Sequence, residues 1–188
     1  GAVGRGSLSN ATTAGDNTAL GASALQETTT GAGNVALGRN ALQYNQTGNY
    51  NVSIGQNSMD AHTAGDQNTA VGFGALGAST TGTYNTALGN QALDANTTGA
   101  QNTAVGSGAL GANTTANANV AVGYQALASN TTGVYNVAVG YGSLDGATTG
   151  ENNIAIGQDA LGSADTTGNH NTAVGTNSGR VITSGTMN

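Results

Sequence analysis

Few residues in this sequence have the chemistry of a catalytic or metal site. The chain holds two histidines, His62 and His170, and no cysteine. Neither histidine is paired with a nucleophile in a recognisable setting, so we expect no catalytic triad and predict that both are solvated loop residues. The absence of cysteine excludes disulfide bonds and thiolate-bound metals. We therefore predict that the protein is not an enzyme and holds no cofactor.

The nine acidic residues are scattered along the chain. Asp60, Asp94 and Asp145 share one position of a repeat, but other copies carry Gly, Gln or Ala there. A repeating calcium site needs an aspartate in every copy, so no metal array is expected. Asp16 and Asp66 are expected to make local turn hydrogen bonds at most.

Aromatic side chains are the remaining candidates for binding. Exposed rings contribute strongly to the recognition of sugars and proteins. The alternative, which we favour at this point, is that the rings cover coil edges or subunit seams. Six of the seven rings fall in two columns of the repeat, Tyr50, Tyr84 and Tyr135 in one and Phe73, Tyr124 and Tyr141 in the other.

All these residues are positioned by an internal repeat. A small residue followed by Val, Leu or Ile and then Gly returns eleven times at steps of 17 residues, with a last step of 18. Such strict spacing indicates equivalent places in a repeating structure. We predict an array of about eleven coils over residues 1–178. It opens in mid-repeat, as expected of an excerpt or a processed product, and the divergent residues 179–188 are expected to cap it or to lead into another domain.

Position 1 of each unit is always asparagine. Asparagine tolerates the left-handed backbone region and bonds neighbouring main chain, so stacked copies at a turn can pair in a structural ladder. The predicted ladder comprises Asn17, Asn34, Asn51, Asn68, Asn85, Asn102, Asn119, Asn136, Asn153 and Asn171.

Positions 2 to 5 predict a short strand that ends at a glycine. Position 4 is always Val, Leu or Ile and is expected to face the core. The glycine at position 5 indicates a sharp bend or the close approach of another backbone. Leu or Met at position 9 predicts a second, weaker strand. The predicted core column is Val3, Leu20, Leu37, Ile54, Val71, Leu88, Val105, Val122, Val139, Ile156 and Val174.

The pattern predicts an all-β fold, a parallel β-solenoid or β-roll with one 17-residue repeat per coil. Helical apolar spacing is absent, and the Asn-Gly dipeptide typical of tight hairpins never occurs. Each coil holds few large aliphatic residues to offset the entropy of ordering. Flat Ala and Gly columns at positions 3, 5 and 8 would allow another chain to pack closely, so we predict a homotrimeric fibre.

The units resemble repeats of known surface fibres. Asn-Val-Ala-Val-Gly-Tyr-Gln-Ala-Leu at 119–127 and Asn-Thr-Ala-Val-Gly-Ser-Gly-Ala-Leu at 102–110 are similar to repeats in the heads of trimeric autotransporter adhesins and in phage tail fibres. The resemblance covers Ala2 to about Ser178, although the unit is longer than the usual adhesin head repeat. It implies a structural and adhesive fibre segment, extracellular on a cell surface or virion, which presents or contributes to the binding of a glycan or protein receptor.

Charge and hydropathy exclude other partners. A net charge of −6 with only three arginines leaves no basic patch for nucleic acid. No apolar run approaches the roughly 20 residues of a membrane span, so no membrane insertion is expected.

Ice binding is the alternative function. Ice-binding solenoids are similar to this chain in carrying ranks of threonine at coil spacing. Adjacent residues of a strand point to opposite faces, so the Thr-Thr pairs of this repeat supply one outward column rather than two. The possible ice-binding rank is Thr30, Thr47, Thr81, Thr98, Thr115, Thr132 and Thr149, with Thr13 and Thr167 at its ends.

Overall fold

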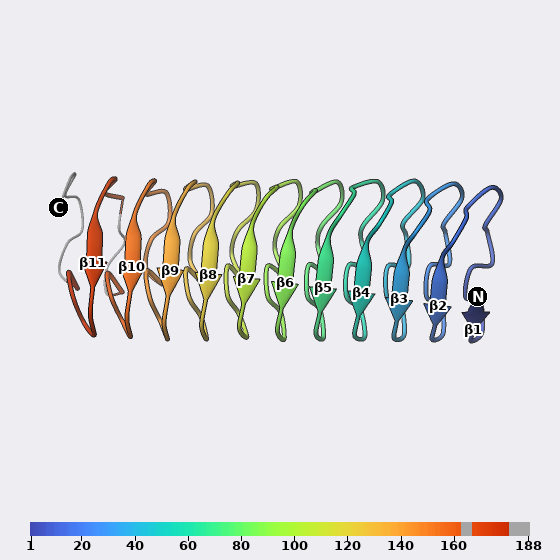
Figure 1. The fold of residues 1–188 in the computed structure, drawn as a ribbon, viewed down its shortest axis with the longest axis horizontal. Coiled ribbons are helices and arrows are strands. Elements are labelled where there is room, and N and C mark those ends of the chain that lie inside the picture. The colour runs from blue at the N-terminus through green and yellow to red at the C-terminus, as the bar shows by residue number, and fades with distance from the viewer. Residues whose placement is uncertain (163–166, 181–188) are drawn as a thin grey trace.

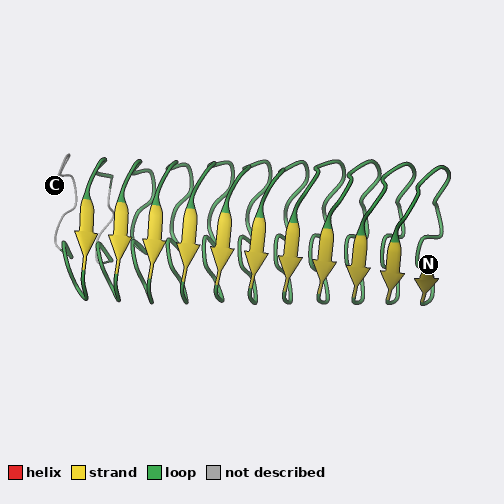
Figure 2. Cartoon of the chain, in the orientation of Figure 1, coloured by secondary structure: helices red, strands yellow, loops and turns green. Residues whose placement is uncertain are grey.

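The structure, a computed structural model, describes residues 1–162 and 167–180. The chain winds as a parallel β-solenoid in which each coil adds one short strand to a single sheet (Figure 1, Figure 2). The described residues contain no helix. The strands are stacked in sequence order as β1 (Ala2–Val3), β2 (Thr18–Leu20), β3 (Val35–Leu37), β4 (Val52–Ile54), β5 (Thr69–Val71), β6 (Thr86–Leu88), β7 (Thr103–Val105), β8 (Val120–Val122), β9 (Val137–Val139), β10 (Ile154–Ile156) and β11 (Thr172–Val174).

The strand register follows the sequence repeat. Ala104 of β7 pairs with Ala121 of β8, its equivalent one coil later. The pairing of β10 with β11 keeps equivalent residues together across the longer step, since Ala155 pairs with Ala173. The predicted solenoid with one 17-residue repeat per coil is therefore confirmed. Of the divergent segment 179–188, only Gly179 and Arg180 lie within the described residues.

The interior is built from small residues and one leucine per coil. Alanines at positions 3 and 8 and the Leu or Met at position 9 form one buried cluster that runs along the rod. In one coil these are Ala104, Ala109 and Leu110, all fully buried. A 17-residue coil is narrow, so the strand can place only a small side chain inside, and the larger leucine enters from the opposite wall.

The predicted core column was wrong for this chain. Side chains alternate along a strand, so the inward alanine at position 3 forces positions 2 and 4 outward. Leu20 is 47% exposed and Leu37 41% exposed. Every residue of the predicted core column is exposed or only partly buried: Val3, Leu20, Leu37, Leu88, Ile156 and Val174 are exposed, and Ile54, Val71, Val105, Val122 and Val139 are partly buried.

The predicted second strand is also absent, because positions 6 to 11 form turns. Leu110 has a φ of 52°, in the left-handed region that side chains rarely adopt. Stacking holds it there, since the Leu110 amide donates to the carbonyl of Ala126 in the next coil at 3.0 Å. The coils therefore pair through their turns as well as through the sheet.

The glycine at position 5 lies where no side chain fits, as predicted. Gly89 has a φ of 145°, and a β-carbon added there would lie 2.6 Å from the carbonyl oxygen of Gly106 in the next coil. Backbone of one coil thus passes directly over backbone of the next, which requires glycine at this position.

Candidate functional site

The asparagines of position 1 form a buried ladder along the rod. The Asn102 side-chain oxygen accepts a hydrogen bond from the backbone N–H of Asn119 at 3.1 Å. Its Nδ2 donates to the carbonyl of Ala116 at 2.8 Å and to Oδ1 of Asn85 at 3.2 Å. The left-handed conformation belongs to the preceding residue, such as Gln101 with a φ of 61°, and not to the asparagine as expected. Since these side chains are buried and bonded within the chain, the ladder leaves no polar group for a ligand.

A second buried polar column lies at position 12. Asn113 donates to Oδ1 of Asn96 in the preceding coil at 2.9 Å and to the carbonyl of Ala116 at 3.2 Å. Asn130 repeats this arrangement with Asn113 at 3.1 Å. The sequence analysis missed this column because its residue type varies among Asn, Ser, Thr, His and Ala. One sequence signal could have identified the column. Most units carry a short polar residue, Asn, Ser or Thr, three places before the residue at position 15, which is usually glycine.

His62 occupies this second column and is fully buried, so its predicted place in a solvated loop was wrong. Its Nε2 lies 2.8 Å from the carbonyl of Gly65, and its Nδ1 lies 3.2 Å from the hydroxyl of Ser79. The carbonyl can only accept, so Nε2 carries the proton and Nδ1 accepts from Ser79. Burial lowers the pKa of His62, although the Gly65 carbonyl and the nearby Asp66 oppose that shift. His170, in contrast, is exposed at position 17 as expected.

We expect this buried histidine to make the rod sensitive to acid. Because folding lowers its pKa, the unfolded chain takes up more protons as the pH falls below about 6.5. The stability that depends on the neutral ring is therefore fully present above about pH 6.5. Below that pH the free energy of unfolding decreases, and the decrease reaches at most about 2 kcal/mol at pH 5. His62→Asn should remove this loss, since asparagine fills the same position at Asn45 and Asn96.

The measurement is the melting temperature by circular dichroism at pH 7.5 and pH 5.5. His170→Asn is the matched control, because it removes an exposed histidine and should keep the pH dependence of the parent. An equal pH dependence in the parent and in His62→Asn would contradict the expectation.

The outward residues of β1–β11 form a continuous surface, called here the sheet face. It consists of positions 2 and 4 of β2–β11 together with Val3 of β1, and it carries only Thr, Val, Leu and Ile. Ten strands contribute two outward columns with no charged or amide side chain. In Figure 2 the strands lie side by side along the whole rod, so the sheet face extends from β1 to β11.

The threonine rank at position 14 is exposed throughout, including Thr98 and Thr132. It lies in a bend and not in a strand. The neighbouring threonines of position 13 are used within the rod, as when the Thr97 hydroxyl donates to the carbonyl of Thr114 at 3.0 Å. One outward column is therefore free, and Ala64 interrupts it.

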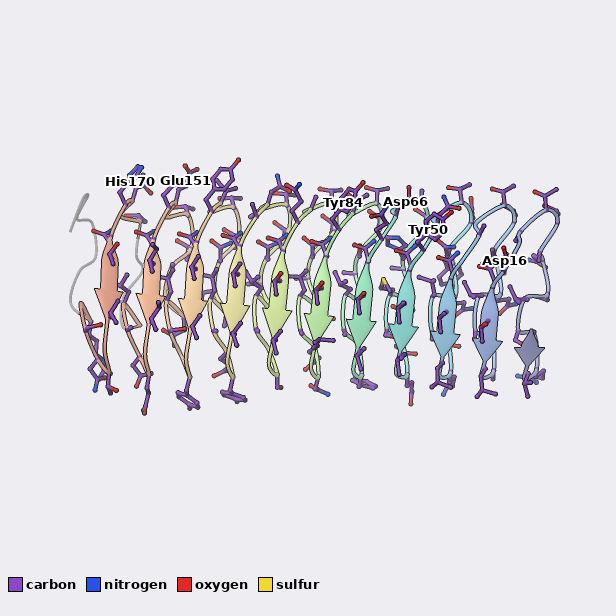
Figure 3. All side chains as sticks on the ribbon, in the orientation of Figure 1. Asp16, Tyr50, Asp66, Tyr84, Glu151 and His170 are labelled. Atoms are coloured by element: carbon purple, nitrogen blue, oxygen red, sulfur yellow. The ribbon has the colours of Figure 1, made fainter. Side chains whose placement is uncertain are left out.

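The aromatic columns lie on opposite long edges of the rod. Position 17 lies in the turns before the strands, where Figure 3 labels Tyr50 and Tyr84 projecting along one edge. Position 6 lies in the turns that follow the strands, on the other edge. There Tyr124 and Tyr141 are stacked with ring centroids 5.4 Å apart and planes inclined by 17°. The tyrosines of position 17 are two or more coils apart and cannot stack.

The acidic side chains also bond between coils. Asp66 accepts from the backbone N–H of Asn49 in the preceding coil at 2.7 Å, so the expectation of local turn hydrogen bonds at most was wrong for Asp66. Burial raises the pKa of Asp60, Asp94 and Asp145, and the charge of Asp159 adds to the effect at Asp145. Among the described residues no group of three His, Cys, Asp or Glu side chains is placed to hold a metal ion.

Neither a pocket nor a helix long and apolar enough to cross a membrane occurs in the part of the chain that the structure describes. The candidate sites are therefore surfaces: the sheet face, the threonine rank and the two aromatic edges. Comparison with known proteins finds no family model, curated protein or solved structure that matches this chain.

Proposed function

We propose that this chain is a structural and adhesive fibre segment, a rod that assembles as a homotrimer and presents or contributes to receptor binding outside the cell, on a cell surface or a virion. The observation that supports it is the sheet face, an uncharged surface as long as the rod. The proposed role requires no catalytic chemistry.

The sheet face carries an aliphatic side chain at position 4 of every strand. Soluble monomers rarely expose contiguous apolar patches larger than a few hundred Å², and larger ones mark interaction sites. Val105 and Val122 are direct neighbours in adjacent strands, and the same pairing recurs along the sheet. The partner that fits best has an uncharged face of the same length and the same strand spacing. A second copy of this chain has such a face.

The structure changes which residues would make the trimer contact. The Ala columns at positions 3 and 8 line the interior of each chain, and the glycine at position 5 packs against the next coil. They are therefore used within one chain and are not free for another. The proposed interface therefore consists of positions 2 and 4 instead, and the sheet faces of the three chains turn toward a common axis.

Sedimentation of the chain at micromolar concentration tests the proposal. We expect three times the 18.1 kDa mass of one chain. The double variant Val105→Lys, Val122→Lys should dissociate the trimer, because each chain would bury two unpaired charges at the interface. Thr98→Lys, Thr132→Lys adds the same charges on the threonine rank and should leave the mass unchanged. A stable, folded monomer of the parent would refute the trimer.

Ice binding is the second candidate, and the exposure of the threonine rank favours it. The position 14 side chains point to solvent in successive coils, which strand spacing places about 4.8 Å apart. If this face binds ice, the parent should show thermal hysteresis, and Thr98→Tyr with Thr132→Tyr should abolish it. Phe73→Tyr, on a different edge, should have no effect. A parent without hysteresis would end this candidate.

A further inference from the structure

The stacked tyrosine pair is the one place in the described chain where two aromatic rings meet. Tyr124 and Tyr141 occupy equivalent positions in adjacent coils, so the coil spacing itself sets their separation. Neither ring belongs to the buried cluster, and 48% of Tyr124 and 56% of Tyr141 is exposed. The pair thus presents a broad aromatic surface to solvent.

Polar side chains flank the pair on both sides along the rod. A β-carbon on Gly108 would lie 3.5 Å from Cγ of Gln125, so the Gln125 side chain leans over the preceding coil beside Tyr124. On the other side, Asp159 leans over Gly142, whose added β-carbon would lie 2.7 Å from its Oδ1. Gln158 donates to the other carboxylate oxygen of Asp159 at 3.3 Å. Amide donors and amide and carboxylate acceptors therefore border the rings.

Small residues leave room above Tyr124. The equivalent position one coil earlier is Ser107, followed by Gly108. No aromatic ring covers that side of Tyr124 as Tyr141 covers the other. The free ring face, with the Gln125 amide beside it, can hold a flat ligand that has one apolar side and a polar rim.

This combination fits a pyranose ring. The axial C–H groups of a pyranose form an apolar face that packs on an aromatic ring, and its hydroxyl groups need both donors and acceptors. The charge favours a neutral sugar, because two carboxylates, Asp145 and Asp159, lie near the site against one nearby cation, Arg180, and the chain carries a net charge of −6. A sialylated or phosphorylated sugar would be repelled there.

We propose that Tyr124 and Tyr141, together with Gln125, Gln158 and Asp159, form a binding site for a neutral, pyranose-containing glycan. This inference rests on the proposed fibre function, for which it names the chemistry of the receptor. Phe73, the isolated ring on the same edge, lacks a stacked partner, and Gln91 lies over Gly74 where Asp159 lies over Gly142.

A printed array of neutral and sialylated oligosaccharides, probed with the complete chain, tests the proposal. The strongest neutral binder is then titrated against the variants. We expect binding to neutral members only, with at least a tenfold loss of affinity in Tyr124→Ala and little change in Tyr124→Phe, which keeps the ring. Phe73→Ala is the matched control on the same edge and should bind like the parent. Failure to bind any neutral member, or unchanged binding by Tyr124→Ala and Tyr141→Ala, would overturn the site.

Sedimentation of the same samples separates this inference from the proposed function. A trimer that binds no neutral glycan would refute the site alone, and a monomer that binds would refute the trimer alone. If Tyr124→Ala dissociates the trimer, the rings belong to a subunit seam and the glycan site is wrong.

Discussion

Gly89→Ala, which adds a single methyl group, is expected to lower the free energy of unfolding by on the order of 4 kcal/mol. The new β-carbon would lie 2.6 Å from both the carbonyl carbon and the oxygen of Gly106, and 3.0 Å from the amide nitrogen of Ser107. These are backbone atoms of the next coil, so no side chain can move aside. A φ of 145° adds further strain for any residue with a β-carbon.

The midpoint of urea unfolding, followed by circular dichroism, measures this effect. Gly108→Asn is the matched control, because Gly108 also has a positive φ but its β-carbon would meet only the flexible side chain of Gln125. Asn40 and Asn57 already adopt this conformation at the equivalent position, each with a φ of 57°. The control should lose less than about 1 kcal/mol. Equal unfolding midpoints for the two variants would contradict the described packing of position 5.

The repeat period made the fold and the strand register predictable. A step of 17 residues places Thr103 beside Val120, and the structure pairs them. Glycine at position 5 was predictable for the same reason. The backbone of the next coil lies too close for a β-carbon at this position, and because this contact repeats in every coil, every coil carries glycine there. Both predictions depend on the spacing of residues and not on which way a side chain points.

The direction of the strand side chains was not predictable from the pattern. Positions 2 and 4 lie on one side of the strand and position 3 on the other, so the same alternation allows either side to face inward. The larger residues were assigned to the core on size. The narrow coil reverses that choice, because the room inside is filled by Leu110 and its equivalents from the opposite wall.

His62 shows the same limit for the candidate sites. The sequence placed it in a variable column that looked like a loop, whereas the structure buries it against Gly65 and Ser79. Its N–H donates at 3.2 Å to the carbonyl of Met59, which has a left-handed φ of 45°. Nothing in the residue types methionine and leucine, which fill that position of the repeat, indicates this conformation. The contact between Tyr124 and Tyr141 was easier to predict, because the two residues occupy equal positions in adjacent coils.

Asn102→Ala is the second substitution with a large expected effect, a loss of about 3 kcal/mol. It removes the acceptor for the Asn119 N–H and the donors to the Ala116 carbonyl and to Asn85. The buried Asn119 N–H is left without a hydrogen bond, which costs about 1 to 3 kcal/mol, and the bonds of the lost amide add to this cost. The Ala116 carbonyl keeps a hydrogen bond from Asn113, and Asn85 Oδ1 keeps one from the backbone N–H of Asn102. Asn90→Ala is the control, because Asn90 is exposed at position 6, where another coil carries Ala22.

Urea unfolding measures the global loss, and hydrogen exchange at the Asn119 amide tests its cause. Exchange there should accelerate in Asn102→Ala and stay unchanged in Asn90→Ala, because only the first variant removes the acceptor of that N–H. A ladder that acts purely through hydrogen bonding between coils also predicts that the effect decreases with distance along the rod. Amides next to Asn17 should therefore keep the protection of the parent. If Asn102→Ala were no more destabilising than Asn90→Ala, hydrogen bonding could not account for asparagine in every coil, and a ligand role for that column would have to be considered again.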